Sequence, residues 1–246
     1  MCPLLVVILS EEIHVFSFPH ASKLLKTIET SPNPKGLCEV CSSADCQLMA
    51  FPGPQKGTVR MVDLLSTEAP EKAFTETICS VHQHELSCLA IDQQGALLAS
   101  TSMKGTLIRI HSTQTRQLLV ELRRGVDMAN IYCLNFSLDS NFLCCCSDKG
   151  TVHVYAVKDQ SLNKKSSFAH ISLLGRALGS YVDSQWGLAL FSVPNESPCV
   201  CAFLGDRKTV VAVCMDGSLY KYSFNLEGSC VRDSFEAYLD VSDNQM

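Results

Sequence analysis

The residues best suited to bind a ligand are two adjacent arginines, Arg123 and Arg124, near the middle of the chain. Arginine suits phosphate because its planar guanidinium group donates two parallel hydrogen bonds. Neighbouring residues of a strand point to opposite sides, so we expect the two side chains to serve two different pockets. Alone, the pair is a weak indication, because adjacent arginines are more often a solvated strand edge.

Polar residues in neighbouring segments favour phosphate binding. Arg109 lies four residues after one glycine, Gly105, whereas His153 lies three residues after the next, with Thr151 on the same face. The side chains of Arg109 and His153 therefore project from opposite faces of equivalent strands. This arrangement is consistent with a separate pocket for each arginine. Hydroxyl groups precede both glycines, at Ser100, Ser102 and Ser147. Guanidinium, imidazole and hydroxyl groups together predict a phosphate cradle. The alternative is that each forms a structural hydrogen bond within its own sheet.

The elements that must position these residues are predicted by a short repeat. Lys-Gly-Thr-Val, or a close variant, recurs at 56–59, 104–107, 149–152 and 216–219, with glycine spacings of 48, 45 and 67 residues. The first two spacings are close to the period of about 40–45 residues of WD-type propeller blades. An apolar run precedes the glycines and an alternating run follows, which indicates strand, turn and strand. No long segment has a helical period, so we predict an all-β, WD-type β-propeller.

The repeats predict a single, partial propeller domain with about four complete blades plus part of another. The predicted blades are 1–33 (partial), 34–81, 82–125, 126–194 and 195–241. The long third spacing predicts an inserted loop at 158–186. Its basic and apolar residues indicate contact with a partner or a membrane; the alternative is a loop folded back on its own blade. The residues concerned are Lys164, Lys165, Phe168, Ile171, Leu173 and Leu174.

Composition excludes several classes of protein. With 46% apolar residues in 246 and a net charge of −5, the chain can form a core but has no overall attraction for nucleic acid. The apolar run at 3–9 is too short to span a membrane and lacks the basic start of a signal peptide, so we predict a buried strand. Most of the 14 cysteines lie in apolar runs, which indicates reduced core thiols in a cytosolic compartment. Cys38 and Cys41, near Cys46, lack a second ligand pair, so we predict no metal site and no cofactor.

From about Leu4 to the C-terminus, the chain resembles the PROPPINs, the β-propellers that bind polyphosphoinositides. The most specific segments are 33–38 (Asn-Pro-Lys-Gly-Leu-Cys), 104–109 (Lys-Gly-Thr-Leu-Ile-Arg), 121–125 (Glu-Leu-Arg-Arg-Gly) and 147–153 (Ser-Asp-Lys-Gly-Thr-Val-His). The family hallmark is Phe-Arg-Arg-Gly; here Leu122 replaces the phenylalanine, as in the branch that includes types 3 and 4 of the WD-repeat phosphoinositide-interacting proteins. The resemblance implies a seven-bladed propeller, with about two blades of the family missing before Met1.

The resemblance also implies two headgroup sites that flank the arginine pair. The first would use His82, for which His84 competes, together with Ser100, Ser102, Thr106, Arg109 and Arg123; the second would use Arg124, Ser147, Thr151 and His153. The implied lipids are phosphatidylinositol 3-phosphate and phosphatidylinositol 3,5-bisphosphate, and the insertion resembles a loop that such propellers push into the bilayer. The implied role is a lipid-reading scaffold in autophagosome formation, recruited from the cytoplasm to preautophagosomal and endosomal membranes. An implied partner is the autophagy lipid-transfer scaffold, whose docking blades are among those missing.

Two other functions compete with lipid binding. One is a WD-type protein-interaction scaffold, in which the arginine pair contacts an acidic peptide. The other is an enzyme with a thiol nucleophile among Cys144, Cys145 and Cys146 near His153, but an apolar strand disfavours the thiolate. No catalytic spacing or phosphate loop is present in the sequence, so we predict no enzyme. Because a partial propeller leaves an unpaired blade edge, we expect the isolated chain to be prone to aggregation.

Overall fold

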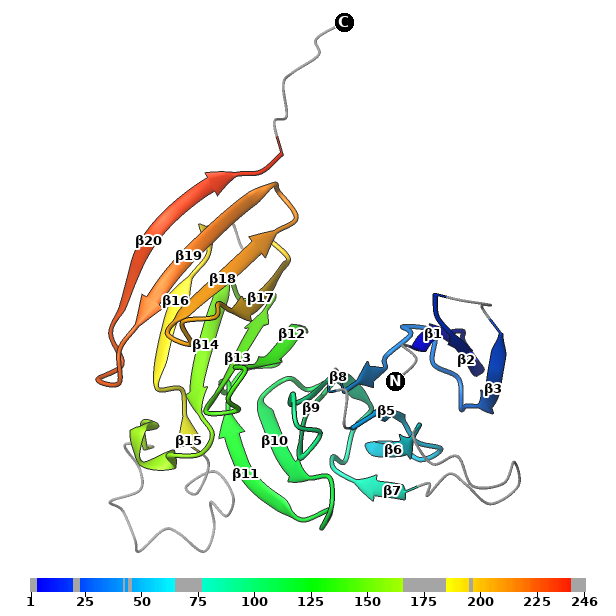
Figure 1. The fold of residues 1–246 in the computed structure, drawn as a ribbon. Helices are drawn as coiled ribbons and strands as arrows, with labels where there is room; N and C mark the ends of the chain where they lie inside the picture. Colours follow the sequence, from blue (N-terminus) through cyan, green and yellow to red (C-terminus); the bar gives the residue numbers. More distant parts are fainter. Residues whose placement is uncertain are drawn as a thin grey trace, which may run out of the picture.

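The computed structural model describes residues 4–19, 23–41, 43, 46–64, 77–165, 185–194 and 197–239. These residues form five sheets that follow one another along the chain (Figure 1). The first is β1 (Leu4–Ile8), β2 (Glu12–Ser17) and β3 (Leu24–Glu29), and the second is β4 (Glu39–Val40), β5 (Leu48–Pro52), β6 (Thr58–Asp63) and β7 (Thr77–Ser80). Among the described residues, no helix is long and apolar enough to cross a membrane.

The third and fourth sheets contain or adjoin the predicted headgroup residues, and a fifth sheet follows them. The third consists of β8 (Leu86–Ile91), β9 (Leu97–Ser102), β10 (Leu107–Ser112) and β11 (Leu118–Arg123). The fourth consists of β12 (Ile131–Phe136), β13 (Phe142–Ser147), β14 (Thr151–Ala156) and β16 (Ala189–Ser192). The fifth consists of β17 (Cys199–Phe203), β18 (Thr209–Cys214), β19 (Ser218–Phe224) and β20 (Cys230–Ala237).

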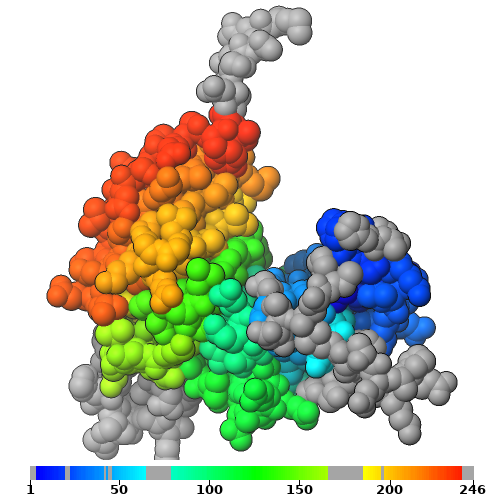
Figure 2. Space-filling view, in the orientation of Figure 1, coloured from blue at the N-terminus to red at the C-terminus, as the bar shows by residue number. Residues whose placement is uncertain are grey.

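The sheets lie in chain order around an arc, and the space-filling view shows the same succession on the surface (Figures 1 and 2). Neighbouring strands within each sheet pair in antiparallel register, from β1–β2 to β19–β20, except for β11 and the short strand β15 (Gln185–Trp186). Four sheets contain at least four strands and the N-terminal sheet contains three. The predicted all-β, partial propeller is therefore confirmed.

Apolar side chains fill the spaces between consecutive sheets, and β13 shows how. Phe142, Cys144 and Cys146 belong to the core shared with the fifth sheet. Leu143 and Cys145 belong to the core shared with the third sheet. Because successive strand residues point to opposite faces, one continuous apolar run packs against both neighbours. All six residues of β13 are buried, as a strand enclosed on both faces requires.

Steric constraints explain why glycine recurs in the turns of the repeats. Gly57 and Gly105 have positive φ angles of 69° and 63°, which most other residues rarely adopt. A Cβ atom on Gly105 would lie 1.8 Å from the carbonyl oxygen of Ala129, and one on Gly57 would lie 1.9 Å from that of His82. Each turn therefore packs against the backbone that enters the next sheet, where only glycine fits.

Two features of the structure differ from what the sequence predicts. The N-terminal strand β1 is largely half-buried rather than buried, because it is at the edge of its sheet and Leu5 remains 44% exposed. The connection between β14 and β16 contains a 3-10 helix at Gln160–Leu162 and a short strand, β15 (Gln185–Trp186). β15 does not join the fourth sheet, between two strands of which it lies in the chain, but pairs in parallel with β11 as a fifth strand of the third sheet (Figure 1).

Candidate functional site

A polar pocket of about 410 Å³ lies at the edge of the third sheet where β9 and β11 end and β10 begins. It brings together five of the six residues predicted for the first headgroup site, from segments up to 41 positions apart. The lining residues are His82, Gln83, His84, Ser102, Lys104, Thr106, Leu107, Arg109, Arg123 and Val126. Both histidines that competed for one position in the sequence line this pocket.

The sixth predicted residue, Ser100, lies behind the pocket wall. It is fully buried in β9, and its Oγ lies 3.1 Å from Nε2 of His82. The same hydroxyl donates a 3.4 Å hydrogen bond to the carbonyl oxygen of Arg109. Ser100 therefore contacts the His82 ring from the buried side of the pocket and helps to orient it.

Arg109 is held in place by an acidic residue that is not among the predicted site residues. Its Nε donates a 2.9 Å hydrogen bond to Oε2 of Glu121, and a second guanidinium nitrogen, Nη1, donates to the carbonyl oxygen of Val81 at 2.8 Å. Arg109 and Glu121 are direct partners in the register of β10 and β11. The carboxylate orients the guanidinium group and offsets part of its charge.

The charge of the pocket comes from its arginines and lysine rather than from its buried imidazole. Burial lowers the pKa of His82 to about 4, and the positive Arg109 adds to the shift. His82 is therefore neutral near pH 7 and presents a polar ring without charge. Three cations, Lys104, Arg109 and Arg123, outweigh the nearby Glu121 carboxylate. Such a pocket favours an anion.

Arg124 turns away from this pocket, although it adjoins Arg123 in the chain. Its side chain is buried, with only 6% of the residue exposed. Its Nε donates a 3.1 Å hydrogen bond to the carbonyl oxygen of Gly105, and its Nη2 donates to that of Asp127. These carbonyls fix the guanidinium group between the third and fourth sheets.

The second predicted set lies on the fourth sheet, near Arg124. Oγ1 of Thr151 lies 3.1 Å from Nε2 of His153. Burial lowers the pKa of His153 to about 4, with a further contribution from the positive Arg124. Ser147 is 1% exposed, and its Oγ accepts a 3.4 Å hydrogen bond from the backbone of Lys149. Arg124, Thr151 and His153 thus lie near one another, whereas Ser147 lies deeper.

The base of the predicted insertion is joined to both sets. The backbone of Trp186 pairs with Arg123 on one side and forms a bridge with Lys164 on the other. Gly187, the next residue, lies close to His153: a Cβ atom placed there would be 3.7 Å from Nδ1 of that ring. Lys164 and Lys165 are exposed. The apolar residues predicted for membrane contact, Phe168, Ile171, Leu173 and Leu174, lie outside the described residues.

Several solved structures have a fold similar to that of this chain. Hsv2 of Kluyveromyces lactis aligns with a TM-score of 0.75 and 21% identity, over 96% of this chain and 71% of that one. KlAtg21, in a complex with the coiled-coil of AgAtg16, aligns with a TM-score of 0.72 and 21% identity, over 96% and 68% of the two chains. These likenesses establish the fold.

Sequence comparisons establish the family. The PROPPIN family model matches residues 3–176. SVP1-like protein 2 of Pichia angusta is 32% identical over 85% of this chain, and Autophagy-related protein 18 of Dictyostelium discoideum is 30% identical over 90%. This chain covers 60% and 63% of the lengths of these two relatives. The match to the family model spans more than half of the chain, and this chain belongs to the PROPPIN family.

Proposed function

We propose that this chain is a non-enzymatic effector that binds phosphoinositide headgroups in membranes through two sites flanking Arg123 and Arg124. The ligands are phosphatidylinositol 3-phosphate and phosphatidylinositol 3,5-bisphosphate. The chain acts in autophagosome formation, recruited from the cytoplasm to the surface of preautophagosomal and endosomal membranes. This role agrees with the names of relatives such as Autophagy-related protein 18 and with membership of the family.

The observation that carries the proposal is the pocket formed by His82, Ser102, Thr106, Arg109 and Arg123. Two guanidinium groups supply the planar donors that bind phosphate oxygens in pairs. The hydroxyl groups of Ser102 and Thr106 supply single donors of adjustable direction. Because Glu121 and the carbonyl of Val81 already hold Arg109, less conformational entropy is lost when an anion binds.

Arg124 extends the same chemistry to a second site. It lies on the opposite side of the strand end from Arg123, beside Thr151 and His153. Two weak headgroup sites on one rigid body gain avidity on a membrane that displays many headgroups. The exposed Lys164 and Lys165 at the base of the insertion add attraction for anionic lipid.

The protonation state of Cys145, a cysteine near His153, supports a non-enzymatic function. Cys145 pairs with His153 across β13 and β14. Burial raises the pKa of the Cys145 thiol well above its ordinary value. A neutral thiol enclosed in a core is a poor nucleophile.

Calorimetric titration with a soluble, short-chain phosphatidylinositol 3-phosphate tests this function. Arg123→Ala should weaken binding at the first site at least tenfold, because a hydrogen bond to a charged group contributes roughly 1.5–3 kcal/mol. Arg232→Ala is the control, since Arg232 is exposed on β20 of the fifth sheet. Short-chain phosphatidylinositol without the 3-phosphate should not bind.

The protein-interaction scaffold is the alternative outcome of the same titration. If the phosphorylated and unphosphorylated lipids bind equally, or if neither binds, the phosphate sites are refuted. Binding of an acidic peptide that depends on Arg123, without lipid binding, would then favour the scaffold.

A further inference from the structure

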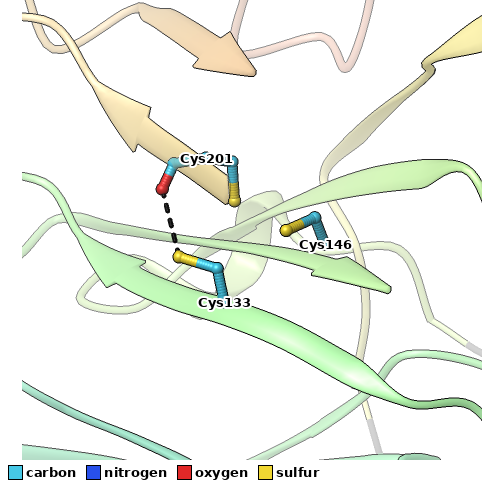
Figure 3. A group of neighbouring side chains, drawn as sticks. All are labelled: Cys133, Cys146 and Cys201. Atoms are coloured by element: carbon cyan, nitrogen blue, oxygen red, sulfur yellow. Dashed lines mark hydrogen bonds between the residues drawn. The ribbon is translucent and has the colours of Figure 1, made fainter. Parts of the chain in front are cut away.

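Three cysteine thiols converge between the last two sheets. Cys133 lies on β12, Cys146 on β13 and Cys201 on β17, and their three sulfur atoms all lie within 4.8 Å of one another. Figure 3 shows Cys133 and Cys146 on neighbouring strands, with Cys201 reaching them from the strand of the adjacent sheet. Cys133 and Cys146 are direct register partners, just after an irregularity between Ile131 and Cys133.

The surroundings of this three-cysteine cluster are apolar. Cys146 and Cys201 are buried in the core between the fourth and fifth sheets, and Cys133 packs against it from a half-buried position. The thiol of Cys133 donates to the carbonyl oxygen of Cys201 at 3.4 Å, and that of Cys146 donates to the carbonyl oxygen of Cys199 at 2.9 Å. The cluster thus offers three soft sulfur ligands in a dry environment, with Cys133 on its accessible side.

We propose that Cys133, Cys146 and Cys201 form a three-coordinate site for a soft, monovalent cation, copper(I). Thiolate ligands select copper(I) and zinc among the common metals. Structural zinc almost always takes four ligands. In this group, the one such group found among the described residues, three sulfurs are mutually close, and the neighbouring thiols of Cys144 and Cys199 are not within the same distance of all three. Three sulfurs around a central ion are what three-coordinate copper(I) requires.

The sulfur separations are close to those of a bound ion. Metal–sulfur bonds of about 2.3 Å in a trigonal plane place the sulfurs about 4 Å apart. Separations of at most 4.8 Å therefore need to contract by less than 1 Å. On binding, copper–sulfur bonds replace sulfur–hydrogen bonds, and the protons pass to solvent. The copper arrives and remains as copper(I), so no electron is transferred.

Binding would add copper–sulfur bonds between two sheets that already share an apolar core and the thiol hydrogen bonds of Cys133 and Cys146. Two ligands belong to the fourth sheet and one to the fifth. Because the unfolded chain does not hold the three sulfurs together, the ion should stabilise the folded state. The site is distinct from the arginine pockets, so this inference does not depend on lipid binding.

The test uses the full chain, reduced and free of oxygen, titrated with copper(I) against a chromogenic copper(I) chelator. Wild type should retain one equivalent and show a higher melting temperature. Cys133→Ala and Cys201→Ala should each reduce the affinity at least tenfold. Cys145→Ala is the matched control, because Cys145 is fully buried on the same strand as Cys146 but belongs to the other core. It should retain the equivalent.

X-ray absorption spectroscopy of the wild-type protein tests the proposal even if a variant fails to fold. Three sulfur ligands around copper are expected. The proposal is overturned if wild type loses all copper to the chelator, if Cys145→Ala loses as much as Cys201→Ala, or if the spectrum shows two or four ligands. Retention of zinc with four ligands in place of copper would also overturn it.

Discussion

Arg109 on β10 and Glu121 on β11 face each other across the two strands, with Nε of the arginine 2.9 Å from Oε2 of the carboxylate. This ion pair places a negative charge beside a pocket that we propose for an anion. The carboxylate orients Arg109 but opposes the ligand's charge. Orientation and charge can therefore be separated by substitution at position 121.

Glu121→Gln should tighten binding of soluble phosphatidylinositol 3-phosphate. The amide oxygen can still accept from Arg109, while one negative charge is lost, which is worth about 1–2 kcal/mol at 10 Å and an effective dielectric constant near 20. The gain in affinity should be about fivefold to thirtyfold. Glu121→Ala removes the orienting acceptor as well and should gain less. Calorimetry on both variants decides, and weaker binding by Glu121→Gln would contradict this account.

Stability should fall below neutral pH because His82 and His153 have pKa values lowered to about 4 by burial. In the unfolded chain their pKa is about 6.5, so between pH 6.5 and 4 the unfolded state binds more protons. The stabilisation is thus complete above pH 6.5 and is lost as the pH falls toward 4. Each imidazole contributes at most about 1.4 kcal/mol per pH unit.

Urea unfolding at pH 7.5 and pH 5 measures this effect. The double variant His82→Gln, His153→Gln should lose less stability between the two pH values than wild type. An unchanged pH dependence in the double variant would show that other groups cause it.

Gly105→Ala should destabilise the fold and disturb Arg124 at once. The residue has a φ angle of 63°, its added Cβ would collide with the carbonyl oxygen of Ala129, and its own carbonyl accepts from Arg124. A non-glycine residue in this conformation costs roughly 1–3 kcal/mol before the collision is counted. Gly125→Ala is the control, because an added Cβ there meets nothing within 4 Å. Thermal unfolding of both variants should show a clear loss for Gly105→Ala alone.

The apolar residues of the insertion should anchor the protein without contributing to headgroup recognition. Replacing Phe168, Leu173 and Leu174 with serine should weaken liposome binding, since one large apolar side chain contributes roughly 1.5–3 kcal/mol when fully buried. Binding of the soluble lipid should hardly change. A control with serine at Leu118, Leu119 and Leu226, which are exposed elsewhere on the protein, should bind liposomes normally. A lower melting temperature with weaker soluble-lipid binding would instead indicate that the insertion packs on its own blade.

The fold was predictable because each repeat carries its own local signals. A glycine that must adopt positive φ, such as Gly105, follows a buried run and precedes an alternating one, and this order recurs four times. The extra strand β15 was not predictable, since two residues carry no pattern and their pairing with β11 depends on the neighbouring sheet.

The site was predictable only to the level of residue type. The sequence could suggest that Arg123 and Arg124 diverge, but not that Ser100 is fully buried behind His82. Glu121 could have been found, because it shares a strand face with Arg123. Cys133, Cys146 and Cys201 could not, because they lie on three strands of two sheets and meet only through register and sheet packing.

The central claim is that the arginine pair reads phosphoinositide on membranes, and co-sedimentation with liposomes containing phosphatidylinositol 3-phosphate tests it most directly. The variants are Arg123→Ala with Arg124→Ala, and the charge-matched control Lys208→Ala with Arg232→Ala, both exposed in the fifth sheet or its turns. Circular dichroism verifies that each is folded. The account predicts that the arginine double variant stays in the supernatant while the control sediments like wild type. Normal sedimentation of the folded arginine double variant would contradict it.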